Sequence, residues 1–190
     1  MVLVYRRSEG PFCQRRLAAL KFELFGGIFM EIRFAHAGDI PGMLELLRQV
    51  GDVHHNIRPD IFRPSALKYD EPALKDILAD ETKPIFVAVD GGFVAGYCFC
   101  VRKDYRGSGV QTDRMELYID DLCVEETRRG GGIATALYRH VTKYAKTLGC
   151  AFVSLNVWCG NDGAMAFYEK MGLRPRHIML EMPLEEENAE

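Results

Sequence analysis

The spacing of apolar and polar positions predicts a chain of alternating strands and helices. Apolar residues three or four positions apart predict four helices. These helices are expected over residues 40–50, 70–79, 133–148 and 161–171. Runs rich in β-branched and aromatic residues predict six strands. These strands are expected over residues 30–34, 84–89, 93–101, 115–124, 151–158 and 178–184. The predicted order is therefore β-α-α-β-β-β-α-β-α-β.

Turn and cap residues separate these elements. The triplet Asp90-Gly91-Gly92 predicts a tight hairpin between two strands. Asp39 and Asp70 stand where helix N-caps are expected. Residues 51–64 and 103–113 are rich in glycine, proline or polar residues and predict irregular connections.

No repeat or low-complexity tract divides the chain, which predicts one α/β (α+β) domain with a mixed sheet over residues 30–184. Residues 185–190 form an acidic tail. For residues 1–29 three interpretations compete: a leader from an upstream start codon, a basic helix that packs on the domain, or a targeting peptide. The segment lacks the apolar run of a secretory signal, which favours an accessory helix or a non-native extension.

Composition excludes several classes of protein. The 24 basic and 27 acidic residues give a net charge of −3, without the basic excess of a nucleic-acid binder. No apolar run reaches the ~18 residues of a membrane-spanning helix. The six cysteines form no C-x-x-C pair, which predicts reduced thiols in a cytoplasmic protein. Histidine and cysteine spacings predict no metal site.

A glycine-rich turn is the strongest chemical signal. The run 128–134, Arg-Arg-Gly-Gly-Gly-Ile-Ala, follows a predicted strand and opens a predicted helix. Glycines let backbone N–H groups approach a phosphate, and a helix N-terminus adds a partial positive charge. Two arginines strengthen the attraction for an anion. We expect a pyrophosphate site here, at the carboxyl end of its strand.

Other phosphate-binding motifs fit this turn poorly. A P-loop needs a lysine after its glycines, and none is present. A dinucleotide fingerprint needs a third glycine where Thr135 stands, and an acidic residue after the next strand, which ends in Val157-Trp158. A glycine-rich turn without any ligand is the alternative that the turn alone leaves open.

The surrounding segments resemble a known family. Residues 129–134 match [QR]-x-x-G-x-[GA], the acyl-CoA signature of the GCN5-related N-acetyltransferases, or GNAT family. Residues 118–124, 155–158 and 161–173 resemble its fourth strand, its fifth strand and the helix that follows, in the same order. The resemblance implies a mixed, mostly antiparallel sheet flanked by helices, and acetyl transfer from acetyl-CoA to an amine by direct attack.

The resemblance also implies a donor site without a metal. The turn would wrap the CoA pyrophosphate, and the preceding strand would pair its backbone with the pantetheine arm where two strands splay apart. An asparagine that could equally be a helix N-cap would contact the arm. The expected donor-binding residues are Leu122, Cys123, Val124, Arg129, Gly130, Gly131, Gly132, Ile133, Ala134 and Asn161.

Acetyl transfer requires a neutral amine, and an alkylamine has a pKa near ~10.4, so a base is expected. Neighbouring residues on a strand face opposite ways, so only one of Asp120 and Asp121 should point into the site. Resemblance to polyamine-acetylating relatives favours Asp120 as the base and leaves Asp121 to brace the sheet or a loop. Glu116, four residues upstream on the same face, is the fallback. Tyr168 matches the family's general acid for the departing thiolate, and packing on the sheet is its alternative role.

The acceptor is the least defined partner. The expected acceptor-binding residues are His54, His55, Arg58 and Glu116. Small amines, polyamines, aminoglycosides and protein N-termini all remain open as acceptors, as does a homodimer. Neither a nucleic acid nor a membrane is expected as a partner. Three rival hypotheses are a non-catalytic acyl-CoA-binding module of the same fold, a nucleotide-binding protein, and an acyl intermediate on Cys123 or Cys159.

Overall fold

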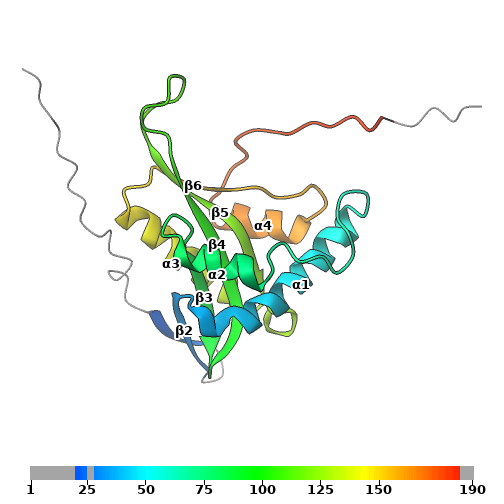
Figure 1. Cartoon of the computed structure of the whole chain (residues 1–190), viewed down its shortest axis with the longest axis vertical. Coiled ribbons are helices and arrows are strands. Elements are labelled where there is room, and N and C mark those ends of the chain that lie inside the picture. Colours follow the sequence, from blue (N-terminus) through cyan, green and yellow to red (C-terminus); the bar gives the residue numbers. More distant parts are fainter. Residues whose placement is uncertain (1–19, 25–27, 185–190) are drawn as a thin grey trace, which may run out of the picture. The chain divides into compact units, whose positions relative to one another are not determined.

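The computed structural model describes residues 20–24 and 28–184, with side chains from residue 30 onward. They fall into two units that meet between Asn156 and Val157 in the sequence, and each unit is described by itself. Their elements, labelled in Figure 1, are β1 (Leu20–Leu24), β2 (Ile28–Phe34), the 3-10 turn η2 (Ala37–Asp39), α1 (Ile40–Ile57), α2 (Glu71–Ala79), β3 (Ile85–Asp90), β4 (Phe93–Asp104), β5 (Met115–Val124), the 3-10 turn η3 (Glu126–Arg128), α3 (Ile133–Thr147), β6 (Phe152–Leu155) and α4 (Asp162–Lys170).

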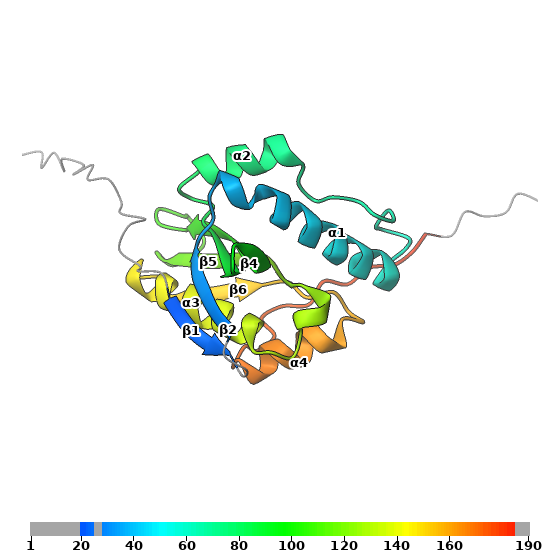
Figure 2. The same cartoon turned by 90° about the horizontal axis from the view of Figure 1, so that it is seen from below.

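The first unit is built on a six-stranded sheet in the order β1-β2-β3-β4-β5-β6. Strands β1 to β5 pair antiparallel with their neighbours, and β6 pairs parallel with β5. Helices α1 and α2 cover one face of the sheet and α3 covers the other (Figure 2). The predicted mixed, mostly antiparallel sheet flanked by helices is confirmed. No described helix is both long enough and apolar enough to cross a bilayer.

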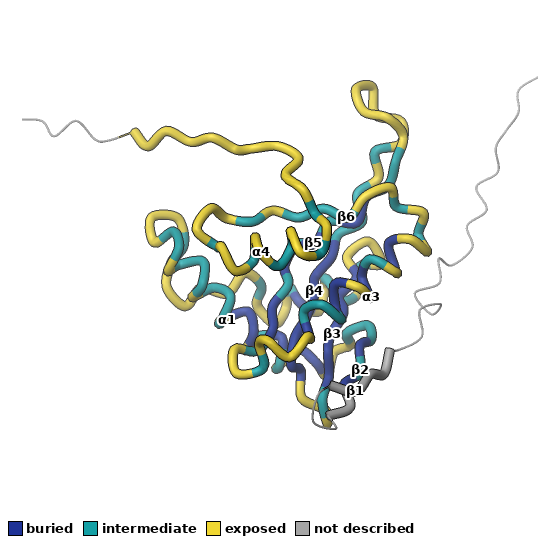
Figure 3. Tube along the Cα trace, turned by 180° about the vertical axis from the view of Figure 1, so that it is seen from behind, coloured by how far each residue is buried: buried dark blue, intermediate teal, exposed yellow. Residues whose placement is uncertain are grey.

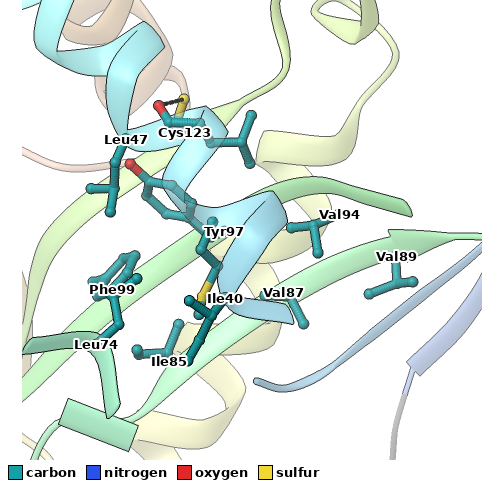
Figure 4. Packing of buried hydrophobic residues seen from close by; sticks show 12 residues of the cluster. Ile40, Leu47, Leu74, Ile85, Val87, Val89, Val94, Tyr97, Phe99 and Cys123 are labelled. Carbon is teal, nitrogen blue, oxygen red and sulfur yellow. Dashed lines mark hydrogen bonds between the residues drawn. The ribbon is translucent and has the colours of Figure 1, made fainter. Parts of the chain in front are cut away.

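The core lies on both faces of the central strands, which are the most buried part of the trace in Figure 3. On one face, Leu46 and Leu47 of α1 pack with the aromatic residues Tyr97 and Phe99 of β4 (Figure 4). On the other face, α3 buries apolar residues four positions apart, the spacing of a helix with one apolar side. These residues are Ile133, Leu137 and Val141.

Two local predictions are confirmed. The β3–β4 hairpin turns at Gly91 and Gly92, whose φ angles of 55° and 89° are those of a two-residue turn that glycine favours. Asp70 caps α2, because its carboxylate accepts the N–H of Ala73 at 2.9 Å.

Asp39 occupies the N-cap position of α1 as predicted, but its side chain makes no capping bond to that helix. The buried carboxylate instead binds the guanidinium of Arg33 at 2.7 and 2.8 Å and accepts the backbone N–H of His36. An ion pair with a bidentate arginine therefore joins the end of β2 to the start of α1.

Helix α1 is longer than predicted, because Gly51 does not end it. The helix runs on to Ile57, and Gly51 lies in its interior. A Cβ atom at this position would lie 2.3 Å from the carbonyl oxygen of Ala66. Glycine is therefore required here because the segment 58–70, which connects α1 to α2, packs closely against the helix at this position.

Replacing Gly51 with alanine should destabilise the protein, although alanine usually favours a helix by about 1 kcal/mol over glycine. The new methyl group would collide with backbone, and overpacking of this kind costs about 1–3 kcal/mol. Urea unfolding measures the change. Gly163→Ala in the first turn of α4 is the control, because no atom lies within 4 Å of its added Cβ. Equal stability of both variants and the wild type would contradict the proposed contact.

One strand prediction and one helix prediction need correction. Residues 178–184 form no regular structure, because β-forming composition describes suitability for a pleated surface and does not supply a pairing partner. Conversely, Leu20–Leu24 is a strand paired with β2, so the helix interpretation of residues 1–29 is wrong for this stretch. Its alternation of apolar and charged residues was the available signal. Residues 1–19 and 185–190 lie outside the described residues, and the domain limits stay a prediction.

Candidate active site

A β-bulge in β5 defines the centre of the candidate site. Phe99 of β4 pairs with Asp121, but the next β4 residue, Cys100, pairs with Ile119. Asp120 is therefore an extra residue without a partner on β4. A bulge interrupts the alternation of side chains along a strand.

The bulge directs both carboxylates to the face of the sheet that α1 and α2 cover. Asp120 accepts the hydroxyl of Tyr69 and Asp121 accepts the hydroxyl of Tyr97. Both tyrosine rings pack against Phe99, at centroid distances of 5.6 and 4.7 Å. The expectation that the two aspartates point to opposite faces of the sheet is therefore wrong, and the bulge is the physical reason.

Asp120 lies at the edge of this face, with a side chain that is 20% exposed. Its Oδ2 atom accepts the Tyr69 hydroxyl at 2.7 Å and lies 2.8 Å from Nζ of Lys68. Burial, and then the bond to Asp120, raises the pKa of Tyr69, so this hydroxyl stays protonated and donates. Both partners come from the segment that precedes α2. The carboxylate favoured as the base thus already holds a cation.

Asp121 is the buried member of the pair. Burial raises its pKa to about 6, and the negative charge of Asp120 adds to the rise, whereas Lys68 and the Tyr97 hydroxyl, 3.1 Å away, oppose it. The two neighbouring carboxylates therefore occupy unlike environments, one at the surface and one in the core.

The raised pKa of Asp121 makes stability depend on pH. A carboxyl group that binds its proton more tightly in the folded state contributes stability below about pH 4, and that contribution is lost as the pH rises through about 6. A shift of about two units corresponds to about 3 kcal/mol. Asp121→Asn should remove this pH-dependent loss of stability. The difference in unfolding free energy between the variant and the wild type should therefore change by up to about 3 kcal/mol between pH 4 and pH 7. Urea unfolding at several pH values measures it, and parallel curves would contradict the assignment.

Glu116, the fallback base and a predicted acceptor contact, is buried. Its carboxylate accepts the hydroxyl of Ser154 on β6, so it joins the two paired strands. Between it and the bulge stands Tyr118, whose ring lies 3.6 Å below the ammonium of Lys103, the distance of a cation–π contact.

Beyond the bulge, β5 has an open edge. Its pairing with β6 ends at Ile119, opposite Leu155, the last residue of β6. The N–H of Glu125 donates to Ala95 on β4, and bonding directions alternate along an antiparallel strand. Leu122 and Val124 therefore direct their N–H and C=O groups away from β4. Among the described strands, no partner takes up these groups, as expected for a slot that holds an extended ligand.

Cys123 differs from its two neighbours. Its backbone faces Tyr97 on β4, and its thiol donates to the carbonyl of Leu46 at 3.6 Å, the dashed line in Figure 4. Burial raises the pKa of this thiol to about 12, so it does not supply the thiolate that an acyl intermediate requires. Cys159, the other candidate nucleophile, is exposed.

The glycine-rich turn has the form of an anion cradle. Gly130 and Gly132 adopt φ angles of 80° and 86°, which favour glycine, and Gly132 is the N-cap of α3 without any side-chain cap. At Gly131, a Cβ atom would lie 3.3 Å from the carbonyl of Arg128. Among the backbone hydrogen bonds of the described residues, none is donated by the N–H groups of Gly132, Ile133 and Ala134. Successive free N–H groups at a helix start are suited to bind a phosphate.

The two arginines of the turn have separate contacts. Arg128 pairs with Asp90 of the β3–β4 hairpin at 2.6 Å and lies over the ring of Phe93. Arg129 donates its Nε–H to the carbonyl of Val124 at 3.2 Å. Arg129 thus lies where the open edge of β5 meets the turn, whereas Arg128 fastens the turn to the hairpin.

A surface cavity of about 370 Å³ lies elsewhere, between the start of α1, the β3–β4 hairpin and Glu125. Neither aspartate of the bulge lines it, and neither does Arg129. The chemistry of the open edge and the turn, rather than the size of this cavity, therefore locates the candidate site.

The predicted acceptor residues of α1 divide into two groups. His54 stacks on Phe62, and burial followed by the charge of Lys68 lowers its pKa. This histidine therefore lies in the electrostatic neighbourhood of the bulge. His55 and Arg58 hold the chain that follows α1: Nδ1 of His55 lies 2.7 Å from the carbonyl of Phe62, and Arg58 pairs with Asp60.

Asn161 and Tyr168 belong to the second unit. Asn161 caps α4 by accepting the N–H of Ala164 at 3.2 Å, which confirms its expected capping role. Tyr168 lies within α4, next to Phe167, whose ring centroid is 5.1 Å away. Their expected contacts with the donor stay predictions.

Sequence reasoning missed three residues of the site: Lys68, Tyr69 and Tyr97. Tyr69 is 51 positions from Asp120, and Tyr97 is 24 positions from Asp121. No motif marks any of them, because only the bulge and the path of segment 58–70 bring them to the aspartates. Among the described residues, no group of three or more histidine, cysteine or acidic side chains could hold a metal ion.

Comparison with known proteins agrees with this geometry. The model of the Acetyltransferase (GNAT) family matches residues 52–173, which include the bulge, the open edge and the turn. The chain belongs to the GNAT acetyltransferase family. The matched range also contains Lys68 and Tyr69, so the whole candidate site of this GNAT protein lies inside it.

Two relatives show how far the likeness extends. The BH1408 protein of Bacillus halodurans, in a mutant crystal structure, is 31% identical with a TM-score of 0.77, and the match covers 80% of this chain and 98% of that one. N-alpha-acetyltransferase 30 of Schizosaccharomyces pombe is 32% identical over 87 residues, 46% of this chain. That match spans 55% of the yeast protein's length.

Other similarities are more limited. The uncharacterized N-acetyltransferase MJ1207 of Methanocaldococcus jannaschii is 36% identical over 61 residues, which span 32% of this chain and 27% of that protein. An aminoglycoside acetyltransferase from a soil metagenome, solved with sisomicin, is 17% identical with a TM-score of 0.63, a likeness of fold alone.

Proposed function

We propose that this GNAT protein is an N-acetyltransferase that moves the acetyl group of acetyl-CoA to a primary amine by direct attack. The observation that carries the proposal is the open edge of β5. It begins at the bulged carboxylate of Asp120 and ends at the free N–H groups of the glycine-rich turn. A donor with an extended arm could pair with the open edge, and its anionic end could bind the N–H groups of the turn.

The described residues fit such a donor. The turn from Arg129 to Ala134 would bind the pyrophosphate through its N–H groups and the start of α3. Leu122 and Val124 would bond the pantetheine arm as an added strand. The arm would then run along β5 toward Asp120, so that the acetyl group lies at the bulge. The expected contact of Asn161 with the arm stays a prediction.

The reaction needs a base for the amine and an acid for the departing sulfur. Asp120 takes a proton from the ammonium of the acceptor, and the neutral amine attacks the acetyl carbonyl carbon. The C–S bond breaks, and the sulfur leaves with the electron pair and takes the proton of the Tyr168 hydroxyl. The nitrogen gives up its second proton, which restores this hydroxyl by way of solvent, and Asp120 releases its proton to solvent. Asp121, buried beside Tyr97, stabilises the bulge and does not touch the acceptor. His54, whose ring stacks on Phe62, would contact the acceptor.

The acceptor class is proposed as a primary amine because the name of one curated relative specifies N-alpha acetylation. Peptide N-termini are therefore the first acceptors to test, followed by polyamines, small amines and aminoglycosides. Detection of the free CoA thiol reports turnover for every member of such a panel. Thiol release that depends on an added amine supports the proposal. If acetyl-CoA binds but no amine releases thiol, the chain is the non-catalytic acyl-CoA-binding module.

A further inference from the structure

A lysine of the chain itself occupies the place that the proposed mechanism assigns to the acceptor amine. Nζ of Lys68 lies 2.8 Å from Oδ2 of Asp120 and 3.0 Å from the backbone carbonyl of the same residue. Its side chain is 40% exposed. The carboxylate expected to deprotonate an acceptor is thus already in contact with a primary ammonium.

Several contacts hold Lys68 in this position. The segment that carries it packs on α1 through the close approach of Ala66 to Gly51, and the backbone N–H of Ser65 donates to Asp52. The next residue, Tyr69, donates to the same carboxylate oxygen and stacks on Phe99. Lys68 is therefore positioned by its neighbours on both sides.

Other ion-paired lysines of the chain are different. Lys75 pairs with Glu71 one helical turn away, and Lys83 pairs with Asp80 three residues away. Both pairs are local and both lysines are exposed, and pairs of this type contribute little. The pair of Lys68 with Asp120 spans 52 positions and joins the α1–α2 connection to the bulge of β5.

The position matters because of where the donor's acyl end would lie. If the pyrophosphate binds at the turn and the arm follows Val124 and Leu122, the acyl end reaches Asp120, where β6 has already ended. Nζ of Lys68 bonds the backbone carbonyl at that same point. The inference that follows therefore rests on the proposed function.

We propose that Lys68 is itself an acyl acceptor, acetylated within its own chain. Asp120 takes one proton from the Lys68 ammonium, and the neutral Nζ attacks the acetyl carbonyl carbon of acetyl-CoA. A C–N bond forms, the C–S bond breaks, and the sulfur leaves with the electron pair and takes up a proton. The products are an uncharged acetyl-lysine and CoA thiol, and one proton passes to solvent.

Acetylation changes the site for later acceptors. The neutral amide no longer forms an ion pair, so the carboxylate of Asp120 becomes available to an external ammonium. A cationic acceptor then no longer has to displace the Lys68 ammonium from the Asp120 carboxylate. The KM for such an acceptor should be lower for the acetylated protein than for the unmodified protein.

Peptide mass spectrometry of the full-length protein incubated with acetyl-CoA tests this inference. The acetyl group should accumulate on Lys68 at least about tenfold faster than on Lys75 and Lys83, which report non-enzymatic acetylation at exposed lysines. The first-order rate should not change when the protein is diluted tenfold. Asp120→Asn should slow Lys68 to the rate of Lys75, and Lys68→Arg should remove the fast event altogether.

The outcomes separate this inference from the proposed function. A Lys68 rate equal to that of Lys75, in a protein that acetylates an external amine, would overturn the inference and leave the function intact. A rate that falls on dilution would show transfer between chains and overturn the intrachain step. If acetyl-CoA neither binds nor acetylates any amine, the proposed function and this inference fail together.

Discussion

Asp120→Asn is expected to lower kcat for an amine acceptor by roughly 100- to 10,000-fold, the usual contribution of a general base. Asparagine keeps the size of the side chain and still accepts the Tyr69 hydroxyl, but it cannot take up a proton. The pH dependence should also change. In the variant, turnover should depend on the free-amine fraction of the acceptor, so with an alkylamine acceptor it should keep rising toward the amine pKa of ~10.4.

Steady-state rates from pH 6 to 10 provide the measurement for Asp120→Asn. Asp76→Asn is the matched control, because Asp76 is an exposed aspartate on α2 and its replacement removes the same charge. The control should keep wild-type kinetics. An unaltered pH profile in Asp120→Asn would move the role of base to Glu116 or to water.

Gly132→Asp is expected to weaken acetyl-CoA binding by roughly 10- to 100-fold. A carboxylate at the start of α3 would repel the pyrophosphate, and such repulsion is worth a few kcal/mol at short range near a protein surface. The φ angle of 86° adds strain for any side chain. Isothermal titration calorimetry measures the affinity directly.

Two further variants separate charge from strain at this turn. Gly132→Asn introduces a side chain of the same shape without the charge and should bind acetyl-CoA more tightly than Gly132→Asp. Gly107→Asp adds the same charge at a loop glycine with a φ of 78° and no atom within 4 Å of the new Cβ. This control should bind like the wild type. Equal affinity of Gly132→Asp and the wild type would show that the turn does not bind the donor.

The parts of the site that are contiguous in sequence were predictable. The turn at residues 128–134 joins a strand to a helix, and its glycines carry the φ angles that such a cradle requires. The strand Met115–Val124 and the hairpin at Gly91 and Gly92 follow from local composition in the same way. Local patterns suffice here because local backbone geometry decides the outcome.

The parts that depend on distant contacts were not predictable. Alternation along β5 predicts opposite faces for Asp120 and Asp121, and only the shifted register opposite Phe99 reverses this. The partnership of Lys68 with Asp120 depends on the path of segment 58–70, which the close contact at Gly51 directs. In the sequence, Gly51 is typical of a helix end, and no local signal distinguishes that role from a site of close packing.

Thermal unfolding with and without acetyl-CoA tests the central claim most directly. Free ligand at about 100 times its Kd should stabilise the fold by ~2.7 kcal/mol, which a melting curve resolves. ATP and NAD at the same concentration serve as comparison ligands that also carry phosphates. The account predicts stabilisation by acetyl-CoA and little by ATP or NAD. Stabilisation by ATP or NAD without any effect of acetyl-CoA would contradict it.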